Sequence, residues 1–270
     1  MALKPAEDEA VAQLLNTYRF GGIELTPTKV WPDLAKVTEV EVKAYRDFWN
    51  NHGVQIVAMQ ALLFGRDDLT IFGSEAKRQE GIEYFKSIFQ IAQWLGAHAL
   101  IYGSPKHRRN VDPSDGSIRK IAQRYFKSLG ALAGQQGICL CIEPLPRNYP
   151  CDFINDSSDA LQFIEEVQEK GFGLHLDASS LFQGGENVPQ TLEAARGRIK
   201  HFHASEPQLA PVLPEGPVPI REYIVLLDRI NYSNWVSIEM LEPQPSGSKI
   251  SVIEKALQYL RHSADLASLR

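Results

Sequence analysis

Four ionisable residues stand at the ends of four successive apolar stretches of the chain. They are Glu143, Asp177, His203 and Glu239, separated by 34, 26 and 36 residues. Each separation is about one strand–helix unit, so a parallel sheet would place all four side chains at one edge. Four polar strand ends in succession favour a shared site over four independent ones. If the sheet closes into a barrel, the side chains converge, and we expect them to bind one metal ion.

Three carboxylates and one imidazole form an oxygen-rich ligand set. Such a set favours one divalent ion, Mn²⁺ first, with Mg²⁺, Co²⁺ and Zn²⁺ as alternatives, over a thiolate-type structural zinc site. The ion could hold two vicinal oxygens of a hydroxy-ketone and lower the cost of the enediolate formed by proton loss. We expect Glu143 and Glu239 to be the catalytic acid and base, on opposite faces of the substrate.

The residues two positions before these candidate ligands form a polar layer. Side chains alternate across a strand, so each of these residues lies directly beneath a ligand. They are Cys141, His175, His201 and Ser237. The layer could orient the ligands by hydrogen bonds, or it could consist of ordinary core residues, which is favoured for the cysteine and left open for the histidines. His201 would lie about 6–7 Å deeper than His203, so we choose His203 as the ligand.

Extended apolar runs and helical patterns must alternate along the chain to position these residues. Strands are predicted over residues 22–25, 54–59, 97–102, 137–143, 172–177, 199–203 and 235–239. A first helix is predicted after Pro5, and further helices over residues 38–51, 74–95, 117–135, 157–169, 189–195, 219–229 and 248–262. Apolar strands separated by helices are typical of a parallel sheet in an α/β protein.

The predicted fold is a (β/α)₈ TIM barrel. Such a barrel uses eight strands, and seven are predicted. The deficit falls at the N-terminus, where residues 1–4 form a short first strand or the first strand is missing. An open doubly wound sheet is the alternative. No compositional break divides the chain, so we expect a single domain over residues 1–270.

The composition excludes several classes of protein. A content of 44% hydrophobic and 23% charged residues is typical of a globular chain rather than a disordered one. No apolar run reaches about 18 residues, so we expect no membrane span, and the N-terminus carries no signal segment. The net charge of −5 argues against nucleic-acid binding. Three cysteines make no disulfide framework, which favours the cytoplasm. The oligomeric state stays open, a homo-oligomer included.

Two further residues could contact a substrate. Lys106 belongs to the most basic segment of the chain, Ser104-Pro105-Lys106-His107-Arg108-Arg109, and could bind a phosphate or carboxylate. A solvated loop is the alternative interpretation. Gln60 follows the predicted strand 54–59 and could hydrogen-bond to sugar hydroxyls or simply pack.

Several segments resemble the sugar phosphate isomerase/epimerase family, the xylose-isomerase-like group of TIM barrels. They are Ile142-Glu143-Pro144-Leu145, His175-Leu176-Asp177, His201-Phe202-His203-Ala204-Ser205-Glu206 and Ile238-Glu239, together with Gly22-Ile23-Glu24 and Tyr102-Gly103-Ser104-Pro105. The resemblance covers most of the chain. It implies one divalent ion on Glu143, Asp177, His203 and Glu239, with the two glutamates as acid and base. It also implies a small carbohydrate substrate, for which we expect contacts from Gln60, Lys106, His175 and Glu206.

Three positions depart from the pattern of the ketose 3-epimerases in this family. Ser180 replaces a histidine, Tyr149 replaces an acidic residue and Leu209 replaces an arginine. Those groups contact sugar hydroxyls in the family, so the departures imply a substrate other than an ordinary free ketohexose. Ser180 and the negative net charge also argue against DNA repair of the endonuclease type.

We therefore predict a divalent-metal-dependent isomerase or epimerase of a small sugar or sugar-like polyhydroxy ketone. One alternative is a dehydratase, a lyase that expels a hydroxyl from an inosose or dehydroshikimate-like substrate on the same metal site. Another is a non-catalytic binding protein that retains the barrel. A product that has lost one water molecule relative to the substrate would indicate the lyase. A purified protein that binds no metal ion would indicate the binding protein.

Overall fold

The centre of the computed structural model, which describes residues 7–109, 116–241 and 249–265, is a parallel sheet. Its strands are β1 (Gly22–Leu25), β2 (Gln55–Met59), β3 (Ala99–Tyr102), β4 (Cys139–Ile142), β5 (Phe172–Asp177), β6 (Ile199–Ser205) and β7 (Val236–Glu239). Neighbours in the chain are neighbours in the sheet, and every pairing is parallel. Because β1 and β7 also approach each other, the sheet is a nearly closed barrel.

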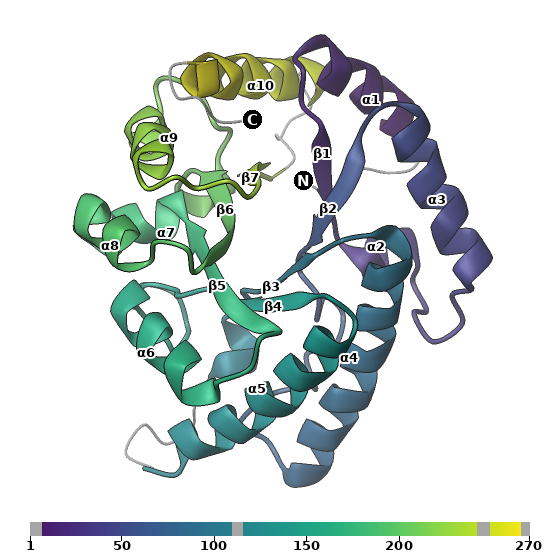
Figure 1. Ribbon diagram of the computed structural model, residues 1–270, viewed down its shortest axis with the longest axis vertical. Coiled ribbons are helices and arrows are strands. Elements are labelled where there is room, and N and C mark those ends of the chain that lie inside the picture. Colours follow the sequence, from purple (N-terminus) through teal and green to yellow (C-terminus); the bar gives the residue numbers. More distant parts are fainter. Residues whose placement is uncertain (1–6, 110–115, 242–248, 266–270) are drawn as a thin grey trace.

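Helices surround the strands on all sides (Figure 1). The longer ones are α1 (Asp8–Thr17), α3 (Glu39–Asn51), α4 (Glu75–Leu95), α5 (Ile118–Gln135), α6 (Ser157–Val167), α8 (Val188–Ala194), α9 (Ile220–Arg229) and α10 (Lys249–Asp265). Shorter elements follow individual strands: α2 (Pro27–Val30) after β1, η2 (Lys106–Arg108) after β3, α7 (Ala178–Gln183) after β5 and η3 (Pro207–Leu209) after β6. These short elements lie at the carboxyl ends of the strands, where barrels of this type bind ligands.

The predicted alternation of strands and helices is confirmed, and the helix boundaries have local causes. Thr38 and Glu41 form a capping box at the start of α3, in which the Glu41 carboxylate accepts the Thr38 N–H at 2.9 Å. Ser74 caps α4 by accepting the Lys77 N–H at 3.3 Å. The sequence did not predict α2 and α7, because four and six residues are too short to show a helical stripe. The predicted first strand, residues 1–4, lies outside the described residues.

The barrel interior differs between its two halves. Val57, Ala58, Ala99, Ile101 and Cys141 form a small apolar cluster, separate from the main core that joins helices to sheet, on the strands β2 to β4. On β5 and β6 the inward side chains are instead the buried histidines His175, His201 and His203. The interior therefore offers polar groups on the side of the barrel where the candidate ligands lie.

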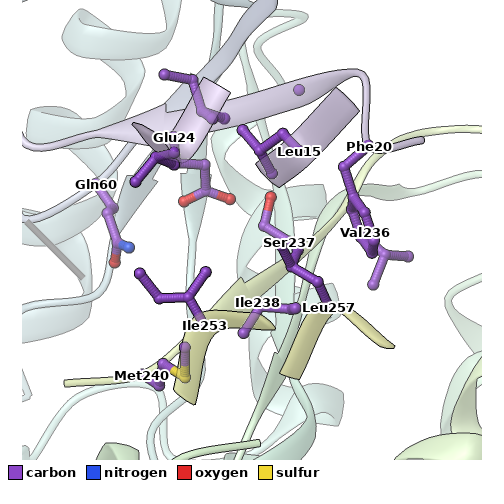
Figure 2. Close-up of a pocket in the computed structure, with 13 residues that line it drawn as sticks. Leu15, Phe20, Glu24, Gln60, Val236, Ser237, Ile238, Met240, Ile253 and Leu257 are labelled. Carbon is purple, nitrogen blue, oxygen red and sulfur yellow. The ribbon is translucent and has the colours of Figure 1, made fainter. Parts of the chain in front are cut away.

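A pocket of about 130 Å³ opens along the seam between β1 and β7. Within the described residues these two strands are not joined by ladder hydrogen bonds. Leu15 of α1 and Ile253 and Leu257 of α10 line the pocket, together with Glu24 and Ser237 (Figure 2). We call it the seam pocket. No helix in the described ranges is long and apolar enough to cross a membrane.

Candidate metal centre and active site

The register of the sheet brings three of the four predicted ligands together. Asp177 is the last residue of β5 and pairs with His203 of β6, while Glu239 is the last residue of β7 and pairs with Ser205 of β6. One ligand atom from each of Asp177, His203 and Glu239 lies within 4.8 Å of the other two. The three groups can therefore bind one ion at the mouth of the barrel.

The donor atoms of this cluster suit a divalent cation. His203 Nδ1 is buried, has no hydrogen-bond partner, and lies 3.2 Å from Glu239 Oε2. The Asp177 carboxylate is fixed by the Ser180 N–H at 2.7 Å and by the Ser205 hydroxyl. An unpartnered imidazole nitrogen facing two carboxylates is a donor set that fits Mn²⁺, Mg²⁺, Co²⁺ or Zn²⁺.

Glu143 borders the same cavity but is not part of this tight set. It follows β4, and its N–H bonds weakly to the Tyr102 carbonyl at 3.4 Å. The Glu143 carboxylate packs directly against Gly103, where any added Cβ would collide with Oε2. The absence of a side chain at Gly103 therefore creates the space in which Glu143 stands beside Asp177 and Glu239.

A cavity of about 260 Å³ lies over these carboxylates. One part of its wall carries hydroxyl groups, and another part is apolar. The hydroxyl groups belong to Ser104, Tyr149, Ser179 and Ser180. The apolar side chains include Leu63, Phe64, Ile101, Leu145 and Leu209. The cavity can thus accept a small molecule that presents oxygens to the carboxylate cluster.

The electrostatics of the cluster follow from burial and like charge. Burial, and then the neighbouring carboxylates Asp177 and Glu239, hold the pKa of Glu143 well above its ordinary value. Burial and Glu239 likewise raise the pKa of Asp177. Burial alone would lower the pKa of His203, but the Glu24 and Glu239 carboxylates beside it raise that pKa well above its ordinary value. A bound cation would relieve this crowding of negative charge.

A second set of potential ligands lies directly beneath the first. Glu24, His201 and His203 also bring ligand atoms within 4.8 Å of one another. Glu24 accepts hydrogen bonds from His203 and contacts His201, and Ser237 Oγ lies 3.0 Å from His201 Nε2. Sequence reasoning placed the histidines and Ser237 here but missed Glu24. The feature that could have identified Glu24 is that it is the one acidic residue within the otherwise apolar run 22–25.

The four residues predicted to bind substrate have different environments. Gln60 and Lys106 line the cavity, and Lys106 also pairs with Asp67. His175 is completely buried in the layer below, and neither of its ring nitrogens has a partner. Glu206 is buried and accepts the Val218 N–H at 3.2 Å. Neither of these last two residues lines the cavity, so the structure gives them no contact with a substrate there.

The predicted basic loop is largely occupied by internal contacts. Arg108 is fully buried, and its guanidinium donates to the carbonyls of Glu143 at 2.7 Å and Gly103 at 3.3 Å. His107 is buried too and contacts Ser104 Oγ at 2.6 Å. These groups shape the backbone beside Glu143, and Lys106 is the member of the segment that reaches the cavity.

The chain is similar to known sugar epimerases. A curated relative, an L-ribulose 3-epimerase from Methylomonas sp. (strain DH-1), is 23% identical over 164 residues, which are 61% of this chain and 54% of the relative. The matched region thus spans about half of that relative.

Solved structures share the fold at lower identity. A structure of L-ribulose 3-epimerase has a TM-score of 0.83 at 17% identity, covering 99% of this chain and 92% of that one. A 3-keto-D-glucoside 4-epimerase from E. coli has a TM-score of 0.77 at 18% identity, with 97% of both chains covered. The model of the family described as "xylose isomerase-like TIM barrel" matches residues 12–263. With seven parallel strands in a nearly closed barrel and this match over almost its whole length, the chain belongs to the xylose isomerase-like TIM barrel family.

Proposed function

We propose that the protein is a divalent-metal-dependent epimerase or isomerase of a small polyhydroxy ketone. The observation that carries the proposal is the convergence of Asp177, His203 and Glu239, with the carboxylates of Asp177 and Glu239 lining one cavity together with Glu143. The similar proteins support the same reaction class, because their names describe epimerases of L-ribulose and of a 3-keto-D-glucoside. Each of those substrates is a sugar with a ketone, which suits a reaction based on proton transfer.

Asp177, His203 and Glu239 would hold the ion, and Glu143 would complete the set. Mn²⁺ is our first choice because the donors are mostly oxygens. When bound, the ion supplies Lewis-acid polarisation of a carbonyl and a fixed template for two vicinal oxygens. The chain itself fixes Asp177 through two hydrogen bonds, which suits a ligand that does not move during turnover.

Glu143 and Glu239 are assigned the proton transfers. One glutamate removes the proton from the carbon next to the ketone, giving an enediolate, and the other returns a proton to the opposite face. Burial and the neighbouring carboxylates raise the pKa of Glu143, which favours a carboxyl that can exchange a proton with the substrate. The surrounding apolar side chains, such as Leu145 and Leu209, would limit the access of water.

Solvent isotope exchange tests the proposed function. Protein loaded with Mn²⁺ is incubated in D₂O with a panel of ketopentoses, ketohexoses, inososes and sugar phosphates, and products are analysed by mass spectrometry and NMR. We expect either an epimer that carries one deuterium at the carbon that lost its proton, or an isomer that carries the deuterium at the neighbouring carbon, which gains the proton. Product without deuterium would indicate hydride transfer, and loss of water would indicate the dehydratase. A wild-type protein that binds no metal and converts nothing would indicate the binding protein.

A further inference from the structure

The imidazole of His203 lies between two carboxylates that come from opposite sides of the barrel seam. Its Nε2 is 3.1 and 3.0 Å from the two oxygens of Glu24, and its Nδ1 is 3.2 Å from Glu239 Oε2. The His203 and Glu24 side chains are only 1% and 5% exposed. The contact between His203 and Glu24 is therefore shielded from solvent.

A neutral imidazole carries one proton, and its partners decide which nitrogen holds it. A carboxylate can only accept a hydrogen bond, so the Glu24 oxygens require a proton on Nε2. A metal ion binds the neutral ring, in which Nδ1 then carries the lone pair, and Nδ1 is the buried nitrogen without a hydrogen-bond partner that faces Asp177 and Glu239. The contact with Glu24 thus sets both the tautomer and the orientation that a metal ligand needs.

We propose that Glu24 is a positioning residue, which holds His203 by its Nε2–H and so prepares Nδ1 to bind the ion. This inference rests on the proposed metal site but concerns a residue outside it. Glu24 lies on β1, whereas His203 lies on β6, 179 residues away in sequence. Figure 2 shows the Glu24 carboxylate pointing into the space between Gln60 and Ser237, next to the seam pocket.

A competing role for Glu24 is direct coordination of a second ion together with His201 and His203. The present contacts favour the hydrogen bond, because both Glu24 oxygens face the same ring nitrogen of His203. A second ion on that nitrogen would have to displace its proton and break the contact. The two roles differ in the number of ions bound per chain, which can be measured.

The test compares Mn²⁺ binding by calorimetry in the wild type, Glu24→Gln and Glu24→Ala. We expect one ion per chain in the wild type and about 10–100-fold weaker binding in both variants. The glutamine variant retains the size of the side chain, so it keeps the test valid if the alanine variant does not fold. Ser237→Ala is the matched control, because Ser237 contacts His201 and lines the same pocket. Its affinity should stay within about twofold of wild type.

A second readout needs no metal. In ¹⁵N-histidine-labelled, metal-free protein, we expect a downfield, slowly exchanging Nε2–H resonance of His203, assigned by its loss in His203→Asn. It should persist in Ser237→Ala and disappear in Glu24→Ala. This signal separates the two proposals: if wild type binds no Mn²⁺, the metal-dependent function fails, yet the resonance still decides the role of Glu24. The inference would be overturned if Mn²⁺ affinity were unchanged in both Glu24 variants, or if the resonance persisted in Glu24→Ala. It would also be overturned if the wild type bound two ions per chain and Glu24→Gln lost one of them.

Discussion

The two acidic residues at the ends of β5 and β7 differ in how firmly their side chains are held. Asp177 is held by a backbone N–H and a serine hydroxyl, so its carboxylate has a fixed orientation. Glu239 has a longer side chain, which is 18% exposed and lies against His203 Nδ1. Under the proposed function, Asp177 would therefore stay on the ion throughout turnover, whereas Glu239 could bind the ion and also reach a substrate carbon.

Replacing Glu239 with glutamine tests this assignment. We expect kcat to fall by about 10²–10⁴-fold, because the variant loses a proton-transfer group. Binding of Mn²⁺ should weaken too, because an amide oxygen is a poorer ligand than a carboxylate. The fold should persist, since this side chain lies at a strand end beside the cavity. Steady-state kinetics and thermal unfolding provide the measurements, with Glu222→Gln, an exposed position on α9, as control for the lost charge. Near-normal turnover would refute the role.

The sequence predicted the convergence of Asp177, His203 and Glu239, with Glu143 nearby, but not the contact that Glu24 makes with His203. Asp177 and Glu239 are the last residues of β5 and β7, and His203 lies near the end of β6 between them, so spacing and alternation are enough to bring them together. Glu24 reaches the site across the closure of the barrel, from the opposite end of the sheet. A contact between the first and a late strand depends on the curvature of the whole barrel, and the pattern of residues within a single strand does not predict that curvature.

The segment between β3 and α5 shows how the role of a charged residue depends on its element. From sequence, the run of basic residues suggested an anion-binding loop. In the structure the η2 turn directs Arg108 inward, where it donates to the carbonyls of Glu143 and Gly103. Those carbonyls lie at the ends of strands, where the ladder of the sheet stops and other donors are needed. Arg108 therefore supports the backbone of Glu143, while Lys106, the residue of this segment predicted to contact substrate, lines the cavity.

Replacing Arg108 with methionine should destabilise the protein by about 2–4 kcal/mol, because buried carbonyls lose a charged donor. It should also lower kcat, since the backbone of Glu143 loses its support. The matched control is Arg109→Met, because Arg109 is exposed and its replacement should change stability by less than about 0.5 kcal/mol. Denaturant unfolding and steady-state kinetics measure the two effects. Equal stability of the two variants would contradict the supporting role of Arg108.

At the scale of the whole molecule, the strand order and the TIM barrel were both predicted from the sequence, and both are confirmed. Apolar runs such as 172–177 and 199–203 have the length and spacing of βα units, and these dictate a parallel sheet. Closure depends on the pairing of the first and last strands, and in the described residues β1 and β7 border the seam pocket without a shared ladder. The barrel also concentrates charge: strand ends that are far apart in sequence bring three carboxylates into one buried space.

This concentration of charge should make the metal-free protein less stable as the pH rises. The pKa values of Glu143 and Asp177 are raised in the folded state by burial and by neighbouring carboxylates, and that of His203 is raised by Glu24 and Glu239. A raised pKa means that the folded state binds the proton more tightly than the unfolded state. Its stabilising contribution is therefore complete at low pH and is lost as the pH rises through the folded-state pKa.

Thermal unfolding between about pH 5 and pH 8, with EDTA or with Mn²⁺, measures this effect. In EDTA the free energy of unfolding should decrease with pH, by up to about 1.4 kcal/mol per pH unit for each proton released. Mn²⁺ should stabilise more at the upper end, because its ligands must be deprotonated. In EDTA, Glu143→Gln should weaken the dependence of the free energy of unfolding on pH. It should also raise the melting temperature near pH 8 by about 2–4 °C for each kcal/mol of repulsion removed. The control Glu222→Gln should show neither effect. Metal-free stability that increases over this range would show that the carboxylate cluster does not carry the charge assigned to it.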